Sequence, residues 1–243
     1  MIGRIMLSAA SLLPVAAAHA QSAPSLGLEA TIDERRRGLS WSEGRASVSG
    51  DVAVTLRAIE LDARVAALRE SVRHDGADAV ADLGAAFVTE AGPFQLRARA
   101  IGHVFAGARS AMNYGEFGGD ARYALGPAEL TVGALYAPPQ DAIGGSNLYL
   151  SGLAVVGIPA TPFTIVGGAG RSSGTVDNAA RADRLRPGSA YVDWRLGVEH
   201  VTGPLTVALE YVGTDLNDDR PIRAIGDRQH SGDRVLARAR IGF

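Results

Sequence analysis

The sequence contains neither cysteine nor lysine in its 243 residues. The absence of cysteine excludes a disulfide scaffold, a thiolate metal site, a thiol nucleophile and a lipid-modified N-terminal cysteine. Because lysine is absent, all 24 basic residues are arginines, and 26 acidic residues bring the net charge to −2. A dedicated nucleic-acid binder usually has a basic surplus, so we expect no nucleic-acid partner.

The first twenty residues have the pattern of a cleaved secretory signal. Arg4 precedes an apolar run over residues 5–18, and the small-residue triplet Ala18-His19-Ala20 closes the segment. The run is shorter than a membrane-spanning helix requires, so a retained anchor is the weaker alternative. We therefore expect residues 1–20 to be a signal peptide and residues 21–243 to form one domain outside the cytoplasm.

The rest of the chain lacks a convincing membrane helix but alternates between apolar and polar residues. Mean hydropathy is +0.07 although 21% of the residues are charged, so the two populations must be segregated over short distances. A period of two places successive side chains on opposite faces of a strand. The alternation predicts twelve strands, at about residues 25–34, 45–56, 59–71, 78–89, 93–105, 113–124, 128–137, 146–157, 162–171, 189–201, 204–213 and 233–243.

Short and long connections alternate along these strands. Tight, often proline-containing turns such as Gly92-Pro93, Gly126-Pro127 and Gly203-Pro204 are separated by longer polar loops such as residues 172–188. Bacterial outer-membrane barrels have this asymmetry, with short periplasmic turns and longer extracellular loops. The predicted fold is therefore all-β, a transmembrane antiparallel up-and-down barrel of twelve strands, spanning residues 21–243.

Two segments have helical alternatives. Residues 51–74 also fit an amphipathic helix, and no turn signal marks the connection near Leu56. Residues 142–170 are free of charge and long enough for a membrane helix, but Pro159 and Pro162 would leave backbone groups unpaired in hydrocarbon. Strands explain both segments better.

The two faces of the predicted strands differ in character. Every second residue of a strand shares one face. The face that carries the charges should line the lumen, and aromatic residues on the opposite face should gather at the two membrane interfaces. The expected lumen residues are Glu29, Asp33, Arg45, Arg64, Arg97, Arg99, Glu116, Asp120, Arg122, Asp193, Arg195, Glu199, Glu210, Arg238 and Arg240. The expected aromatic girdle is Phe87, Phe94, Tyr123, Tyr136, Phe163, Trp194, Tyr211 and Phe243.

Charges on neighbouring strands complement one another. Arg97 and Arg99 lie between a strand with Asp82 and one with Glu116 and Asp120. Where the first and last strands meet, Arg238 and Arg240 should contact Glu29 and Asp33. Such rows of ion pairs can line a water-filled pore or close the lumen, and the sequence does not distinguish these alternatives.

Three segments of the mature chain are similar to segments of one known family. They are Arg37–Ser42 after the first strand, Tyr191–Val198, and Leu209–Asp215 near the end. In these segments the chain resembles the TorF family of porin-like outer-membrane proteins of Gram-negative bacteria. It departs from that pattern in Glu34-Arg35-Arg36, where aromatic residues are expected, and in its lack of lysine. The terminal Phe243 resembles the signal by which barrel-assembly machinery recognises outer-membrane proteins. The resemblance implies a porin-like barrel.

Other chemistry is poorly supported. The glycine-rich run at residues 164–174 has no lysine and no following helix pattern, so a phosphate loop is not expected. No histidine has a serine or a second histidine at a useful spacing, and we expect neither an enzyme nor a metal site. The acidic loop with Asp215, Asp218 and Asp219 should be a solvated surface that at most attracts divalent cations.

The run Arg35-Arg36-Arg37 is the one basic cluster. It should form a solvated loop base near the outer headgroups, and the sharper alternative is contact with lipopolysaccharide phosphates or attraction of anionic solutes.

These observations predict a channel of the cell outer membrane that passes small polar solutes by passive diffusion, needs no cofactor, and contacts outer-membrane lipid and lipopolysaccharide. The alternative is a non-conducting structural or adhesive barrel whose lumen is closed by ion pairs.

Overall fold

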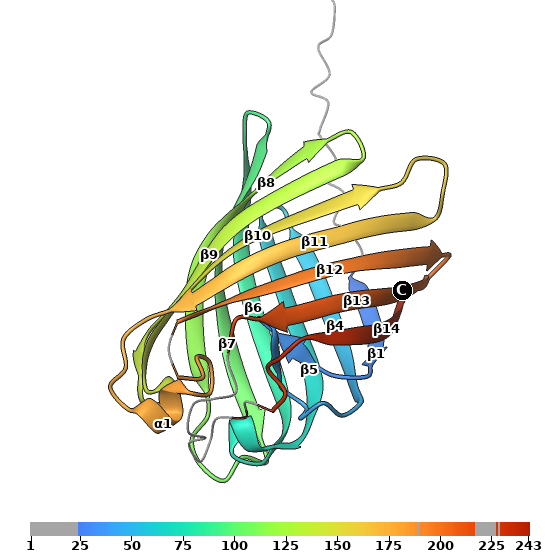
Figure 1. The fold of residues 1–243 in the computed structure, drawn as a ribbon. Coiled ribbons are helices and arrows are strands. Elements are labelled where there is room, and N and C mark those ends of the chain that lie inside the picture. Colours follow the sequence, from blue (N-terminus) through green and yellow to red (C-terminus); the bar gives the residue numbers. More distant parts are fainter. Residues whose placement is uncertain (1–23, 189, 217–226, 228) are drawn as a thin grey trace, which may run out of the picture.

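The computed structural model describes residues 24–188, 190–216, 227 and 229–243. The predicted signal peptide, residues 1–20, lies outside this part of the chain. Twelve antiparallel strands form a closed barrel in which the last strand pairs with the first (Figure 1). They are β1 Ser25–Thr31, β4 Ser47–Leu56, β5 Ile59–Ser71, β6 Ala77–Ala91, β7 Phe94–Ala106, β8 Tyr114–Leu125, β9 Ala128–Gln140, β10 Gly145–Gly157, β11 Phe163–Ser173, β12 Tyr191–Thr202, β13 Leu205–Thr214 and β14 Arg234–Gly242. The predicted twelve-stranded up-and-down barrel is confirmed.

The barrel closes between β1 and β14. Glu29 lies opposite Arg240 in this register, and Leu26 and Phe243 exchange backbone hydrogen bonds of 3.1 and 2.9 Å beyond the last residue of β14. Closure pairs both edges of the sheet, which is what a strand architecture needs to satisfy its backbone in lipid.

The two helical alternatives are wrong, and the predicted strands are confirmed there. Leu56 pairs with Ile59 across the two-residue turn between β4 and β5, and Arg57 in that turn has a left-handed φ of 59°. Two-residue hairpin turns need such backbone angles, which glycine usually supplies. Because this turn contains no glycine, the sequence did not indicate it. In the uncharged segment, Ile158 donates a backbone hydrogen bond of 2.9 Å to Phe163 across the turn between β10 and β11.

The first long loop contains two short strands where only a loop was expected. β2 Arg35–Arg36 and β3 Leu39–Ser40 form a separate hairpin. Three short helical turns lie in other long loops: η1 Val72–His74, η2 Asp141–Ile143 and α1 Ala179–Ala182. Among the described residues, no helix has the length and apolarity of a membrane span.

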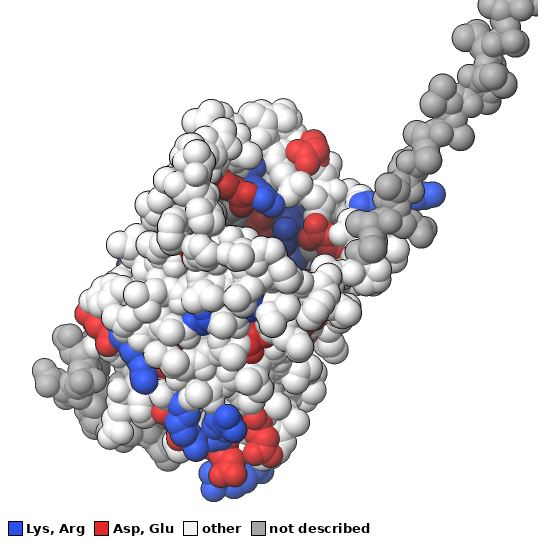
Figure 2. Space-filling view, turned by 90° about the vertical axis from the view of Figure 1, so that its right-hand side faces the viewer, with Lys and Arg blue, Asp and Glu red and all other residues white. Residues whose placement is uncertain are grey.

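The barrel wall exposes its apolar side chains. Leu28, Val132 and Leu209 are each about 60% exposed, although they belong to the middle of regular strands. Figure 2 shows a side of the barrel that is mostly uncharged, with charged side chains gathered towards its ends. In Figure 1 the long loops and α1 lie at the lower end, which we call the mouth, and the short turns lie at the other end.

Candidate functional site

The inner face of the barrel carries most of the charged strand residues. Strand pairing places the following predicted lumen residues at inward positions: Glu29, Arg64, Arg97, Arg99, Glu116, Asp120, Arg122, Asp193, Arg195, Glu199, Glu210, Arg238 and Arg240. Two expected members lie elsewhere. Asp33 follows the end of β1 and is buried in the mouth. Arg45 precedes β4, so strand parity does not apply to it, and its half-exposed side chain donates to the carbonyl of Arg69 on the rim.

One arginine joins three carboxylates at the barrel seam. Arg238 on β14 lies 2.8 Å from Glu199 and 2.6 Å from Glu210. It also reaches Glu29 on β1 at 3.3 Å, as the strand order predicts. A guanidinium offers five donors in a fixed plane, which suits it to bridge several carboxylates.

The predicted contact between Arg240 and Asp33 is wrong. Arg240 instead donates two hydrogen bonds, of 2.5 and 2.9 Å, to Asp51 on β4. Gly27 on the intervening strand makes this possible, because a Cβ there would lie 2.1 Å from an Nη atom of Arg240. Asp33 turns into the mouth, where Arg35 donates to it at 2.8 Å.

Arg97 and Arg99 lie between β6 and β8 as expected, and Arg97 is opposite Asp120 in the register, but their ion pairs are with a more distant strand. Arg97 lies 3.6 Å from Glu60, and Arg99 lies 4.0 Å from Asp62, both on β5. Strand β6 stands between them, but its Gly84 has no side chain, and a Cβ there would lie 2.3 Å from Oδ1 of Asp62. Asp62 therefore leans across β6, so inward glycines decide which charges meet.

The lumen away from the mouth is solvated. Arg97, Arg99 and Arg122 line a cavity of about 270 Å³ together with Asp120 and Glu129. Side chains of the ion pairs here remain 26–44% exposed, so these pairs contribute little stability and leave the arginines open to solutes.

The expected girdle aromatics all occupy outward positions. Phe94 and Tyr123 contact each other near the short turns, with ring centroids 5.4 Å apart, and Phe163 lies 5.0 Å from His200. Tyr136 meets Phe117 edge to face at 5.7 Å. The remaining members are Phe87, Trp194, Tyr211 and Phe243.

The β2–β3 hairpin folds inward and fills the mouth. Its turn, Arg37-Gly38, has left-handed φ values of 51° and 74°, as a two-residue hairpin turn requires. Only glycine fits at position 38, because a Cβ would lie 2.4 Å from Cγ2 of Thr214 on the wall. We call residues 32–46, which contain this hairpin, the plug.

Arg37 anchors the tip of the plug to three wall strands. Its guanidinium donates to Glu116 on β8 at 2.6 Å and lies 4.4 Å above the ring of Tyr149 on β10. The hydroxyl of Tyr191 on β12 donates to the Arg37 carbonyl at 2.9 Å. Charge-assisted and cation–π contacts of this kind are strongest where water is excluded.

Two further ion pairs hold the base of the plug. Arg64 on β5 donates two hydrogen bonds, of 2.7 and 3.0 Å, to the Glu34 carboxylate. Arg36 lies 2.7 Å from Asp82 on β6 and 4.2 Å above the ring of Trp41. Burial opposes ionisation of Glu34, but the hydrogen bond from Arg64 and the charges of Arg36 and Arg64 lower its pKa below the ordinary value.

The expectation for the arginine run is therefore wrong. Arg35, Arg36 and Arg37 were expected on a solvated loop near the headgroups, with lipopolysaccharide as the sharper alternative. Their side chains are only 5–18% exposed and pair with carboxylates inside the mouth. The wall supplies the inward carboxylates Asp82 and Glu116, and sequence proximity gives no sign of these long-range partners.

An apolar core packs beneath the plug. It resembles the interior of a soluble protein and lies inside one end of the barrel. Its larger members are Trp41, Leu68, Val80, Phe105, Met112, Tyr114, Ile143 and Leu185.

Fully buried arginines bind the carbonyls of the long loops. Arg73 donates to the carbonyl of Ser40 in the plug at 2.9 Å. Arg184, just after α1, donates to the carbonyls of Met112 and Ala142 at 3.0 and 2.7 Å. Both arginines belong to long connections between strands, and their role could not be predicted because no periodicity marks a buried loop residue.

Two histidines belong to the mouth. His74, in the loop after β5, is fully buried between Trp41 and Phe105, with ring centroids at 4.3 and 4.7 Å. His103 on β7 points inward, with Nδ1 2.7 Å from Asp82 and Nε2 3.5 Å from Glu116.

No cluster of metal-ligating side chains occurs among the described residues. In the acidic loop, Asp218 and Asp219 lie outside the described part, and Asp215 accepts a backbone hydrogen bond of 2.8 Å from Val192.

The chain matches one family of uncharacterised bacterial proteins. The family model, described as "Bacterial protein of unknown function (Gcw_chp)", covers residues 16–235. A search of curated proteins found no match.

Several solved structures have a similar fold. One, from a study of in-meso crystallization of membrane proteins, is 11% identical with a TM-score of 0.53, over 90% of this chain and 83% of the other. LpxR from Salmonella typhimurium is 10% identical with a TM-score of 0.45, over 90% and 99% of the two chains. The outer-membrane channel DcaP of Acinetobacter baumannii is 10% identical with a TM-score of 0.46, over 90% and 96%. The first similarity supports the barrel fold, and the two scores below 0.5 carry no further argument.

Proposed function

The chain belongs to the Gcw_chp family, and we propose that it is a porin-like channel of the bacterial outer membrane. Small polar solutes pass by passive diffusion along the charged inner face, and the plug at the extracellular mouth limits their flow. The resemblance to the TorF family of porin-like proteins points the same way.

The main support for this proposal is that apolar side chains lie on the outside of the barrel and charged side chains on the inside, the reverse of a soluble protein. Outward positions hold exposed apolar side chains such as Leu28 and Val132, while inward positions hold arginines and carboxylates. In water such an outer surface would aggregate, whereas in a bilayer it is the stable one. The solvated cavity at Arg97, Arg99 and Arg122 gives polar solutes a favourable path on the periplasmic side.

The outer-membrane location has two further supports. Residues 1–20 have the pattern of signal peptides, which direct chains across the inner membrane. Phe243 is an exposed aromatic residue that pairs with β1, and we propose that assembly machinery engages it.

The plug is the one observation that favours the alternative, a non-conducting structural or adhesive barrel. Its pairs with Asp82 and Glu116 are buried, and an apolar core packs beneath it. A channel therefore requires that solutes pass beside the plug or that the plug moves.

Single-channel recording of the mature protein in planar bilayers tests the proposal. We expect small conductance steps from the wild type and larger or more frequent steps from Glu116→Gln, which loses the anchor of Arg37. Glu129→Gln is the matched control, because Glu129 also faces inward and binds an arginine, but lies in the solvated half. Absence of steps from the wild type would overturn passive diffusion and leave the closed barrel.

A further inference from the structure

Arg171 is a charged residue on the outer face of the barrel. Its neighbours on β11 point inward: Ser172 is fully buried, and a Cβ on Gly170 would lie 2.1 Å from the hydroxyl of Tyr149 inside the barrel. Because side chains alternate along a strand, Arg171 points outward, and it is exposed there.

No other outward position of the described barrel strands holds an arginine or a carboxylate, apart from the bulge at Arg69 and Glu70. The backbone of Arg171 is paired within the sheet, but its side chain makes no hydrogen bond or ion pair with the described residues. A charge on the lipid-facing side of a barrel is costly in hydrocarbon and tolerable at the interface, where headgroups can pair with it. Arg171 lies two residues from the mouth end of β11, which is an interfacial position.

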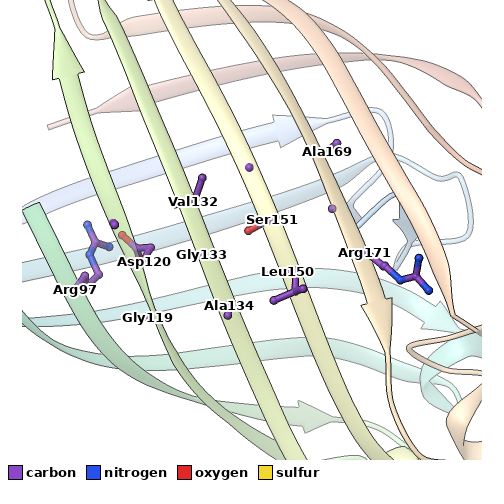
Figure 3. Close-up of a pocket in the computed structure, with 13 residues that line it drawn as sticks. Arg97, Gly119, Asp120, Val132, Gly133, Ala134, Leu150, Ser151, Ala169 and Arg171 are labelled. Carbon is purple, nitrogen blue, oxygen red and sulfur yellow. The ribbon is translucent and has the colours of Figure 1, made fainter. Parts of the chain in front are cut away.

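A shallow, open hollow adjoins Arg171 on the same outer face. Gly119, Ala134, Gly152 and Ala169 form its floor on four neighbouring strands, and Val132 and Leu150 rise beside them. Figure 3 shows Arg171 extending from β11 at one edge of the hollow. The surface thus combines a mostly apolar depression, whose lining also includes the inward residues Arg97 and Asp120, with one outward unpaired cation at its extracellular edge.

We propose that the hollow and Arg171 bind a phosphorylated lipid of the outer leaflet, the lipid A part of lipopolysaccharide. An acyl chain fills the depression, and a phosphate accepts hydrogen bonds from the guanidinium, whose planar donors match phosphate oxygens. This site replaces Arg35-Arg36-Arg37 as the place of lipopolysaccharide contact, because those side chains face the interior. The inference rests on the proposed outer-membrane location but not on conduction.

Charge complementarity favours a lipid over a second copy of the chain. The outward strand positions that a second copy could present offer apolar groups and no carboxylate outside the bulge at Glu70. A protein contact there would bury Arg171 without a counter-charge, which is strongly destabilising. A lipid phosphate supplies the missing anion at the depth where Arg171 lies.

Native mass spectrometry of the detergent-purified mature protein tests the site. The probes are diphosphoryl lipid A, the same lipid without phosphates, and phosphatidylglycerol. We expect wild type to retain diphosphoryl lipid A, and Arg171→Gln to bind it about tenfold more weakly, as loss of a charge-assisted hydrogen bond implies. Arg109→Gln is the control, because Arg109 is 75% exposed at the same end but belongs to the loop after β7.

A second variant tests the hollow separately. A side chain added at Gly152 would meet no atom within 4 Å, so Gly152→Leu fills the depression without disturbing the wall. We expect it to weaken lipid A binding as well.

Equal binding by wild type and Arg171→Gln would overturn the inference. So would a preference for phosphatidylglycerol over lipid A, or a dimer that forms without lipid and is lost in Gly152→Leu. The proposed function fails on a different measurement, namely absence of the protein from outer-membrane fractions or of conductance in bilayers.

Discussion

Arg37 and Glu116 lie 79 positions apart in the sequence, yet the guanidinium of Arg37 donates to the Glu116 carboxylate at 2.6 Å. The glutamate comes from the wall and the arginine from the tip of the plug, so this pair joins the plug to the barrel. The side chain of Glu116 is 1% exposed and that of Arg37 17%, so neither charge can be satisfied by bulk water if the other is removed.

Replacing Glu116 with glutamine should therefore release the plug while leaving the barrel folded. Removing one partner of a buried ion pair typically costs about 3–5 kcal/mol, because the other charge stays buried alone. We expect trypsin to cleave after Arg35, Arg36 and Arg37 in Glu116→Gln and to spare these bonds in the wild type, with fragments identified by mass spectrometry. Glu129→Gln should behave like wild type, and an equally resistant Glu116→Gln would show that the pair does not hold the plug.

The plug should loosen in acid through His74. Burial, with the positive charges of Arg184, Arg73 and Arg36 and of His103, lowers the pKa of His74 well below its ordinary value. A histidine that is neutral when folded binds a proton only on opening, so its contribution is full above about pH 6.5 and declines below it. The loss is about 1.4 kcal/mol per pH unit until the folded pKa is reached.

Trp41 packs on His74 and reports this opening by fluorescence. Trp194, the other tryptophan, faces outward and can be replaced by phenylalanine to leave one signal. We expect the Trp41 signal to change between pH 6.5 and 4.5, and to change less in His74→Phe. An identical pH profile in both proteins would contradict the assignment.

Two glycines on the barrel wall should differ in their tolerance of alanine. A Cβ on Gly118 would lie 2.0 Å from the backbone oxygen of Ala134 on the next strand, whereas one on Gly152 meets nothing within 4 Å. Gly118→Ala must displace backbone and should destabilise the barrel by about 1–3 kcal/mol, as overpacking does. Urea unfolding in detergent should show this shift for Gly118→Ala and none for Gly152→Ala.

Deletion of Phe243 should impair assembly more than stability. The side chain is 71% exposed, so its removal costs little packing, although its backbone pairs with Leu26. We expect less heat-modifiable barrel in outer-membrane fractions of cells, but normal refolding of the purified variant in detergent. Normal levels in cells would argue against a role of Phe243 in recognition by assembly machinery.

The barrel strands could be predicted because their signals are local. The alternation around Leu26 and Leu28, or around Arg238 and Arg240, needs only a few residues, and one parity must face away from the lumen. The plug could not be predicted in this way. Arg35, Arg36 and Arg37 are a basic run in a loop, and only the approach of β6 and β8 supplies Asp82 and Glu116.

The specific lumen contacts were out of reach for a related reason. Arg240 passes over Gly27 to Asp51, and Asp62 passes over Gly84 towards Arg99, because a missing side chain on one strand lets its neighbours meet. Strand order alone predicts ion pairs between adjacent strands. It does not show where a glycine on the intervening strand lets more distant side chains meet.

The sequence by itself determined the number of strands, the order of short and long connections, and which parity of each strand is charged. These properties follow from periodicity and turn chemistry along a single segment. The tertiary structure alone decided that the first long loop turns inward, that an apolar core fills the mouth, and that Arg171 is isolated on the outer face. Those outcomes depend on which side chains the closed barrel brings together across the lumen, and a linear pattern contains no such distances.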